Sequence, residues 1–287
     1  MPDLFFNPST IAVIGATSNP KKFGNAVTLN ILSNNNLKSE LFLISRSSEE
    51  ILGHKCYKTL FDVPKEIDLA ILLIPAKAVM SLIDDCIKKK VKRIIIVTSG
   101  FGEVNQEGKK IEEIITDKCN KANIRVMGPN CVGIQNTELQ LNASFIQMPK
   151  KGRIGMISQS GSIGCAAFYA LQNWNLGISK FANIGNAIDI SFTEILDYLG
   201  RDNDTELIAI YLESINDAKG FFNKLKEITI KKPIVLLKGG KTESGLKAAS
   251  SHTGSVATDY KILSTAVKQA NGIICESMHD LIIAIKT

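Results

Sequence analysis

Short apolar runs alternate with longer amphipathic stretches along the first half of the chain. The apolar runs predict β-strands at 11–14, 40–44, 69–74, 93–97 and 125–127. Helix-like patterns lie near 24–33, 51–53 with the turn that follows, 77–90 and 107–122. Such alternation is typical of a parallel sheet that helices cover on both faces. Residues 70–74 (AILLI) are apolar at every position, as expected of a central strand buried on both sides.

The alternation lapses over residues 128–152, which are polar and rich in turn-forming residues, and it resumes at Arg153. A second set of strands is predicted at 154–157, 180–183, 207–211, 234–238 and 273–275. Helices are predicted near 162–174, 190–199, 217–228, 259–270 and 278–286. We therefore predict an α/β protein with two domains, residues 1–147 and 148–287.

Composition excludes several classes of function. The chain is 45% hydrophobic and 22% charged, no apolar run reaches membrane-spanning length, and the N-terminus lacks a signal-peptide pattern, so a cytoplasmic protein without membrane contact is expected. The net charge is +6, but the lysines are scattered and not interleaved with aromatics, so nucleic acid is not an expected partner. The six cysteines show no metal-ligand spacing, which favours reduced thiols and no metal site.

The first strand runs into a glycine turn within "IAVIGATSNPKKFG", residues 11–24. Backbone N–H groups at such a turn, together with the helix that follows, commonly hold a phosphate. A nicotinamide or flavin dinucleotide would require G-x-G-x-x-G and an acidic residue after the second strand. Here Gly15 and Gly24 lie nine positions apart, and that acid is missing. The nearby cations are Lys21, Lys22 and Arg46. They favour a ligand with an additional phosphate, and at this point NADP and coenzyme A both qualify.

Two further glycine turns mark the second half. In "GRIGMISQSGSIG", hydroxyl groups and a glycine precede a predicted helix, an arrangement typical of an anion site. The stretch "KGGKTESGLKAASSHTGSVA" carries His252 in a glycine- and hydroxyl-rich loop without Asp or Cys neighbours that would suggest a metal. Acid–base or nucleophilic chemistry by the imidazole is the remaining interpretation. Glu213 ends a predicted strand, where it can orient that imidazole.

Taken together, these motifs resemble the NDP-forming acyl-CoA synthetase superfamily. The resemblance is to the α-subunit portion of archaeal-type ADP-forming acetyl-CoA synthetases and, more distantly, to the succinyl-CoA synthetase α subunit. It is carried in family order by "FFNPSTIAVIGATSNPKKFG", "ILGHKCY", "TSGFGE", "GPNCVG", "GMISQSGS", "NIGNAIDI" and "SSHTGSVA". It implies a Rossmann-like CoA-binding domain followed by a flavodoxin-like ligase domain.

The resemblance also implies a reaction in three reversible steps. Inorganic phosphate attacks an acyl-CoA to give an acyl phosphate and free coenzyme A, His252 takes the phosphoryl group, and the phosphohistidine passes it to ADP or GDP. Glu213 would orient or stabilise the histidine. No ATP-grasp pattern is visible in this chain. ADP or ATP and Mg²⁺ would therefore bind to an ATP-grasp β-type partner subunit in a hetero-oligomer, and the substrate would be a small carboxylic acid or its acyl-CoA.

Binding residues follow from the same resemblance. The nucleotide of coenzyme A would be surrounded by Gly15, Ser18, Lys21, Lys22, Gly24, Ser45 and Arg46. The path of the adenine and pantetheine groups would be lined by Pro75, Ala76, Ser99, Gly100 and Phe101, with Asn130 and Cys131 near the thioester. Cys131 would not be a nucleophile, because phosphate attacks in this chemistry. The phosphate would be held by Ser160, Gly161, Ser162, Thr253 and Gly254.

Two other functions stay open at the level of sequence. One is a non-catalytic CoA-binding or sensing module of the same fold, suggested by the missing partner domain and by altered acidic residues at 189–193. The other is an NADP-dependent reductase, suggested only by the first glycine turn and its cations. It leaves the second domain and His252 without a role.

Overall fold

The computed structural model describes residues 3–22, 24–34, 36–240 and 259–287. The chain forms two compact units. Unit 1 contains Met1–Met148 and Gly185–Ile190, and unit 2 contains Pro149–Ile184 and Ser191–Thr287. The short segment Gly185–Ile190 therefore packs with a unit from which it is distant in sequence, and nothing in its local pattern indicates this.

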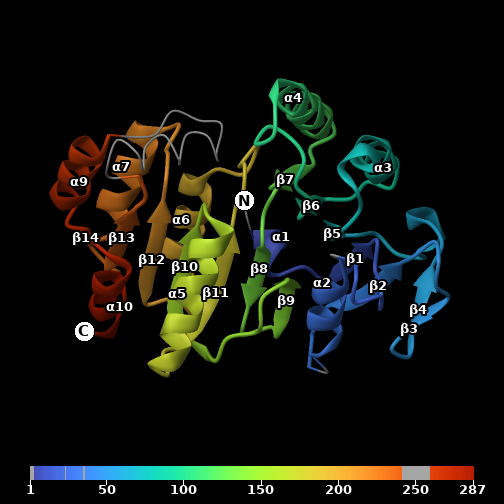
Figure 1. Ribbon diagram of the computed structural model, residues 1–287, viewed down its shortest axis with the longest axis horizontal. Coiled ribbons are helices and arrows are strands. Elements are labelled where there is room, and N and C mark those ends of the chain that lie inside the picture. Colours follow the sequence, from blue (N-terminus) through green and yellow to red (C-terminus); the bar gives the residue numbers. More distant parts are fainter. Residues whose placement is uncertain (1–2, 23, 35, 241–258) are drawn as a thin grey trace. The chain divides into compact units, whose positions relative to one another are not determined.

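Unit 1 is built on a sheet with the strand order β3-β4-β2-β1-β5-β6-β7 (Figure 1). The strands that form its parallel part are β1 (Thr10–Ile14), β2 (Glu40–Ile44), β5 (Leu69–Leu72), β6 (Arg93–Ile96) and β7 (Arg125–Met127). Each begins at or within one residue of the predicted start. Their inner residues are fully buried, because helices cover the sheet. The helices of unit 1 are α1 (Asp3–Phe6), α2 (Gly24–Leu32), the 3₁₀ turn η1 (Leu60–Asp62), α3 (Ala76–Lys88) and α4 (Gln106–Lys121).

The helix-like prediction at 51–53 is wrong. Strands β3 (Glu50–Ile51) and β4 (His54–Tyr57) pair antiparallel here, and β4 also pairs in parallel with β2. Leu52 has φ 51° and Gly53 has φ +80°, so both residues of the connection are left-handed. Two successive positive φ angles produce a tight hairpin turn, which a right-handed helix cannot contain.

The polar stretch expected to be irregular contains an antiparallel hairpin of β8 (Gly133–Asn136) and β9 (Leu141–Ser144). Its polar side chains are buried and bond to one another, as when Gln135 Nε2 donates to Asn142 Oδ1 at 3.2 Å and to Ser144 Oγ at 3.1 Å. From α2, Asn30 Nδ2 donates to the carbonyl of Ser144 at 2.9 Å. Mutual hydrogen bonding lets these residues occupy buried strand positions, so hydropathy alone does not reveal the strands.

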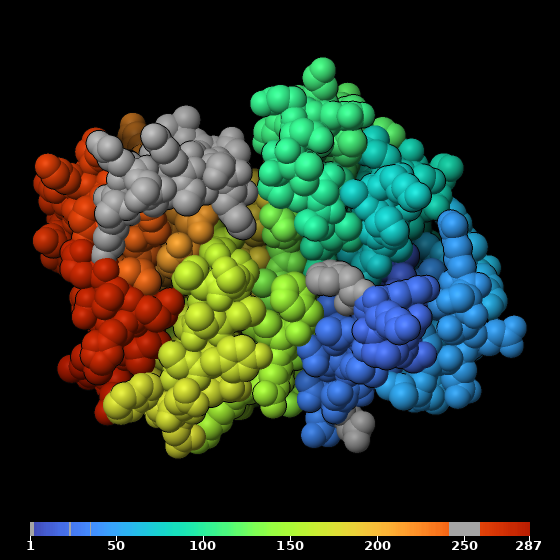
Figure 2. Space-filling view, in the orientation of Figure 1, coloured from blue at the N-terminus to red at the C-terminus, as the bar shows by residue number. Residues whose placement is uncertain are grey.

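Unit 2 contains parallel strands in the order β14-β13-β12-β10-β11. They are β10 (Lys151–Ser158), β11 (Ile178–Asn183), β12 (Leu207–Leu212), β13 (Ile234–Lys238) and β14 (Ile273–Cys275). Their helices are α5 (Gly161–Asn173), α6 (Phe192–Arg201), α7 (Ala218–Ile228), α9 (Tyr260–Gln269) and α10 (Met278–Lys286). All were predicted to within three residues at each end. Figure 2 shows α5 on the surface of this unit.

In each sheet, the strands that follow one particular strand in the chain are added on both of its sides, so the strand order reverses direction there. In unit 1, β1 lies between β2 and β5, and in unit 2, β10 lies between β11 and β12. In open parallel sheets, ligands bind beyond the carboxyl ends of the strands at such a switch point. The loops after β1 and β10 are the first and second glycine turns of the sequence, so topology and sequence motif indicate the same two places. No helix of the described ranges is both long and apolar enough to cross a membrane.

Candidate functional site

The loop after β1 is shaped by close backbone packing at the carboxyl edge of the unit 1 sheet. Gly15 has φ +90°, and a Cβ there would lie 2.7 Å from the carbonyl oxygen of Leu73. A Cβ on Gly24 would lie 3.1 Å from the carbonyl oxygen of Gly15. Any side chain at Gly15 would therefore strain the backbone and collide with the loop after β5. The two glycines allow the start of α2 to approach the end of β1.

The outer part of this loop is braced from within and presents polar side chains to solvent. Asn25 Nδ2 donates to the carbonyl of Thr17 at 3.2 Å, and the N–H of Lys21 donates to Asn19 Oδ1 at 2.9 Å. The predicted nucleotide ligands Ser18, Lys21, Lys22 and Arg46 are exposed, whereas Gly24 and Ser45 are buried. The exposed side chains are available to an anionic ligand, which suits their predicted role. That role itself stays a prediction.

The loops after β5 and β6 lie on the same edge. Pro75 precedes α3, Ala76 begins it, and Thr98 Oγ1 donates to the carbonyl of Ile74 at 2.6 Å, which ties the two loops together. Ser99 and Gly100 are exposed. Phe101 is 0% exposed and belongs to the core of unit 1, so its side chain supports the turn from inside the unit.

A partly buried acidic network holds this turn, and it was not predicted from the sequence. Glu103 Oε1 accepts from the N–H of Gly100 at 2.5 Å. Asn186 Nδ2 donates to Glu103 Oε2 and to Glu112 Oε1, both at 2.6 Å. Glu112 is 2% exposed, and its Oε1 also accepts a hydrogen bond from the N–H of Gly102 at 3.2 Å. Burial alone would raise the pKa of Glu103, but the hydrogen bonds from Gly100, Asn186 and Phe101 outweigh burial and lower that pKa.

The predicted thioester end is anchored by the same asparagine. Asn130 has φ 57°, and its Nδ2 donates to Asn186 Oδ1 at 3.2 Å. Cys131 is 3% exposed, and its Sγ donates to the carbonyl of Ile96 at 3.3 Å. Burial raises the pKa of Cys131 to about 12, so at neutral pH the side chain is an inert thiol. That Cys131 is not a nucleophile stays a prediction, which the burial of the thiol favours.

In unit 2, the loop after β10 ends at the start of α5. Ser160 is the N-cap of that helix, its Oγ accepting from the N–H of Ile163 at 3.4 Å and lying 3.2 Å from Ser162 Oγ. The first N–H groups of a helix have no acceptor within it, and the positive end of the helix dipole favours an anion there. Gly161 and Ser162 supply two of these groups, and Ser162 is exposed. The predicted phosphate ligands from this turn therefore lie together.

Glu213 directly follows β12, one strand away from that helix start in the sheet order. It is 7% exposed and hydrogen-bonds Tyr211, and burial followed by the charge of Glu213 raises the pKa of Tyr211. A Cβ on Gly239 would lie 2.4 Å from Tyr211 Oη and 3.3 Å from Glu213 Cγ. Because residue 239 is a glycine, it leaves room for the side chains of Tyr211 and Glu213.

Lys238 is a second buried charge at this edge. It is 2% exposed, and its Nζ donates to the carbonyl of Gly239. Burial lowers its pKa, while the carboxylates of Glu213 and Asp259 oppose that shift. Tyr211 and Lys238 were also missed. The signal for both is a polar residue near the end of an otherwise apolar strand.

Three predicted residues, His252, Thr253 and Gly254, lie outside the described residues. The described residues on either side of that segment are Gly240, two positions after β13, and Asp259, whose side chain caps α9 by accepting from the N–H of Ile262 at 2.9 Å.

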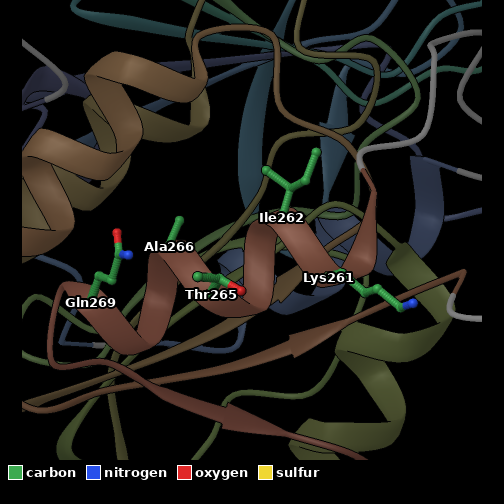
Figure 3. A pocket seen from close by; sticks show the side chains of 5 residues that line it. All are labelled: Lys261, Ile262, Thr265, Ala266 and Gln269. Atoms are coloured by element: carbon green, nitrogen blue, oxygen red, sulfur yellow. The ribbon is translucent and has the colours of Figure 1, made fainter.

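Apart from these edges, α9 has a shallow depression on its own surface (Figure 3). It is lined by Lys261, Ile262, Thr265, Ala266 and Gln269. All five come from one helix, and none was predicted to act in the reaction. A ligand site normally combines polar groups from several elements, so the two sheet edges are the stronger candidates.

Comparison with known proteins covers nearly the whole chain. Residues 9–137 match the family model of a CoA binding domain, and residues 151–287 match that of a succinyl-CoA ligase like flavodoxin domain. The α subunit of acetate–CoA ligase [ADP-forming] II from Pyrococcus furiosus is 41% identical over 282 residues, which are 98% of this chain and 61% of that protein. The 4-hydroxybutyrate–CoA ligase [ADP-forming] of Nitrosopumilus maritimus is 37% identical over 280 residues, 96% of this chain and 40% of that protein.

A solved structure is similar over the same extent. It is the dinucleotide-forming acetyl-coenzyme A synthetase 1 of Ca. Korarchaeum cryptofilum in complex with phosphate and ADP, with a TM-score of 0.93 and 36% identity. The match covers 98% of this chain and 61% of that chain. This chain therefore spans about three fifths of that structure and of the Pyrococcus relative.

Proposed function

This chain belongs to the NDP-forming acyl-CoA synthetase superfamily, and from that premise we propose that it is the α-type part of an ADP-forming acid–CoA ligase. The edge of the unit 1 sheet binds coenzyme A, and the edge of the unit 2 sheet handles the phosphoryl group. The match of residues 9–137 to a CoA binding domain favours coenzyme A over NADP as the ligand of the first glycine turn.

The reaction proceeds through an acyl phosphate. A phosphate oxygen attacks the thioester carbonyl, the C–S bond breaks, and coenzyme A leaves as the thiolate. An imidazole nitrogen of His252 then attacks phosphorus, which breaks the bond to the carboxylate oxygen and releases the acid. Glu213 holds the imidazole in one tautomer and stabilises its positive charge. Finally, an ADP oxygen attacks phosphorus and frees His252.

The nucleotide enters from a partner of the ATP-grasp type. Among the described residues, no group of three or more His, Cys, Asp or Glu side chains is arranged to hold a metal ion. Because Mg²⁺ accompanies nucleotide phosphates, we assign it to the partner together with ADP and ATP. The substrate class is a small carboxylic acid and its acyl-CoA.

The observation that carries the proposal is the placement of the two glycine turns at the switch points of two sheets, in a chain whose histidine loop follows β13. The first N–H groups of α5 and the buried carboxylate of Glu213 lie at neighbouring strand ends in unit 2, which supports the proposed anion site. The relatives reported above carry names of ligases or synthetases, so the comparisons do not favour a non-catalytic module.

The test is phosphorylation with radiolabelled ATP in the presence of the ATP-grasp partner. We expect an acid-labile, base-stable label on the wild type and none on His252→Ala. His54→Ala and His279→Ala are matched controls, because both histidines are exposed, and each should keep the full label. A label retained by His252→Ala would overturn the assignment. Coenzyme A binding by the wild type without any label would instead favour the non-catalytic module.

A further inference from the structure

Gln159 lies between the end of β10 and the cap of α5, and its side chain binds the backbone that carries Glu213. Gln159 Oε1 accepts from the N–H of Glu213 at 2.6 Å and from the N–H of Ser214 at 2.9 Å. Its Nε2 donates to the carbonyl of Ser214 at 2.9 Å. One side-chain amide thus makes three hydrogen bonds to two consecutive residues.

These bonds continue the sheet beyond its last backbone pair. Strands β10 and β12 are in register up to Ser158 and Tyr211, and the N–H of Gln159 still donates to the carbonyl of Tyr211 at 3.2 Å. Beyond that point the main chain of β10 turns towards α5. The Gln159 amide, which has the donor and acceptor of a peptide group, takes the place that the next peptide of β10 would occupy.

The side chain of Glu213 is fixed from another direction. Tyr211 hydrogen-bonds its carboxylate, and Gly239 packs against both. Gln159 thus binds the Glu213 backbone beside Ser160, while Tyr211 contacts the Glu213 carboxylate. Ser160 is the next residue in the chain after Gln159, so the connection between the anion site and the acid is direct.

We propose that Gln159 is a positioning residue that holds Glu213 in register with the phosphate-binding start of α5. This inference rests on the proposed function, since it assigns to Gln159 the spacing between the phosphate and the acid that orients the histidine. Displacement of a catalytic group by about 1 Å is enough to cost about 100-fold in rate. The loss of three bonds to one short segment allows a displacement of that size.

The decisive variant is Gln159→Met, which keeps the length of the side chain and removes its hydrogen bonds. We expect the rate of phosphorylation to fall by about 10- to 100-fold. The Kd for coenzyme A should stay at the wild-type value, because unit 1 is untouched. Gln269→Met on α9 is the matched control, since Gln269 is exposed in the same unit, and it should behave as wild type.

Gln159→Glu gives a signature that a merely structural role would not produce. Its carboxylate can still accept from both N–H groups and loses only the bond to the Ser214 carbonyl. We therefore expect the phosphorylation rate of Gln159→Glu to lie between those of the wild type and Gln159→Met. This rescue by a conservative variant follows from restored positioning of Glu213, and a rate equal to that of Gln159→Met would contradict it.

Hydrogen exchange separates failure of this inference from failure of the proposed function. In Gln159→Met, the amides of residues 213–214 should exchange faster, while those of β10 and of residues 207–211 keep their protection. Wild-type phosphorylation rates in Gln159→Met, or unchanged exchange at 213–214, would overturn the role of Gln159 and leave the ligase proposal standing. A wild type that is never labelled would overturn both.

Discussion

The carboxyl edges of the two sheets share a topology and differ in how they are made. In unit 1, the edge at β1 is shaped by backbone, with Gly15 in a left-handed conformation against the carbonyl of Leu73. In unit 2, the corresponding edge is lined by the buried side chains of Tyr211, Glu213 and Lys238. Where a glycine lacks a side chain, a ligand can approach the peptide N–H groups closely. Where charged side chains are buried, their electrostatic effect on a bound group is fixed.

The difference fits the two tasks proposed for the edges. Coenzyme A is large and already charged, and recognising it requires open backbone and exposed cations. Transfer of a phosphoryl group requires a histidine held in one tautomer, and a carboxylate achieves this most effectively where water is excluded. The two edges should therefore respond to different substitutions, and the following predictions test that separation from the largest expected effect to the smallest.

Glu213→Gln should reduce phosphorylation of the chain most strongly. The amide keeps the shape of the side chain but removes the charge that stabilises the imidazolium, and comparable changes lower rates by about 10²- to 10⁴-fold. Rapid-quench measurement with labelled ATP gives the rate, and calorimetry should show an unchanged Kd for coenzyme A. A rate within threefold of the wild type would remove Glu213 from the mechanism.

Gly15→Ala should act on the other edge. A left-handed alanine costs about 1–3 kcal/mol, and its Cβ would press on the Leu73 carbonyl. If the loop relaxes by distorting the site, the affinity for coenzyme A falls by about 10- to 100-fold. Calorimetry measures this effect. Phosphorylation from ATP should continue at the wild-type rate, and its loss in a folded variant would contradict the separation of the two edges.

Glu103→Gln should have a moderate and pH-dependent effect. The folded pKa of Glu103 is lowered, so its ionised form stabilises the protein above the unfolded value of about 4.3, and this contribution disappears as the pH falls through the folded pKa. At pH 7 we expect a loss of about 1–3 kcal/mol. Urea denaturation at pH 7 and near pH 3 should show the difference between wild type and variant narrowing at the lower pH. A difference that is constant over this range would contradict the role of the charge.

Cys131→Ala should have the smallest effect on function. The thiol is buried with a pKa of about 12, so it should not react with iodoacetamide at pH 8 until the protein unfolds. The affinity for coenzyme A and the phosphorylation rate should both stay within about twofold of the wild type, which corresponds to a free-energy change below about 0.5 kcal/mol. Rapid alkylation of the native protein, or a tenfold loss of activity in a folded variant, would show that the thiol takes part.

Most strands and helices could be predicted because their signal is local. Residues 70–74 are apolar throughout since both faces of β5 are covered, and the strands of unit 2 follow the same rule. Prediction failed in β8 and β9, where buried polar side chains hydrogen-bond one another. It also failed at Leu52 and Gly53, where two residues with left-handed backbone turn the chain. In these places the outcome depends on partners or on φ angles, and hydropathy reports neither.

The candidate site divides in the same way. The glycine turns and Glu213 carry their own signals, because an anion site and a strand-end acid each need particular residue types at fixed places. Asn186 lies in the motif NIGNAIDI, but nothing there indicates its partner: it lies 83 residues from Glu103 in sequence, and only folding brings the two together. Gln159 lies within a motif that marked its neighbours, yet its importance appears only when its bonds to Glu213 and Ser214 are seen.

The sequence by itself determined two parallel α/β units, the two glycine turns and the chemistry that their residue types permit, whereas the strand order of the structure placed those turns at switch points. Tertiary structure alone decided which residues hold those turns in place. Within each unit, loops distant in the chain end at one edge of the sheet. This brings the N–H of Glu213 to Gln159 in unit 2 and Asn186 to Glu103, Glu112 and Asn130 in unit 1. A hydrogen bond depends on distance and angle in space, and linear spacing does not specify either for residues so far apart.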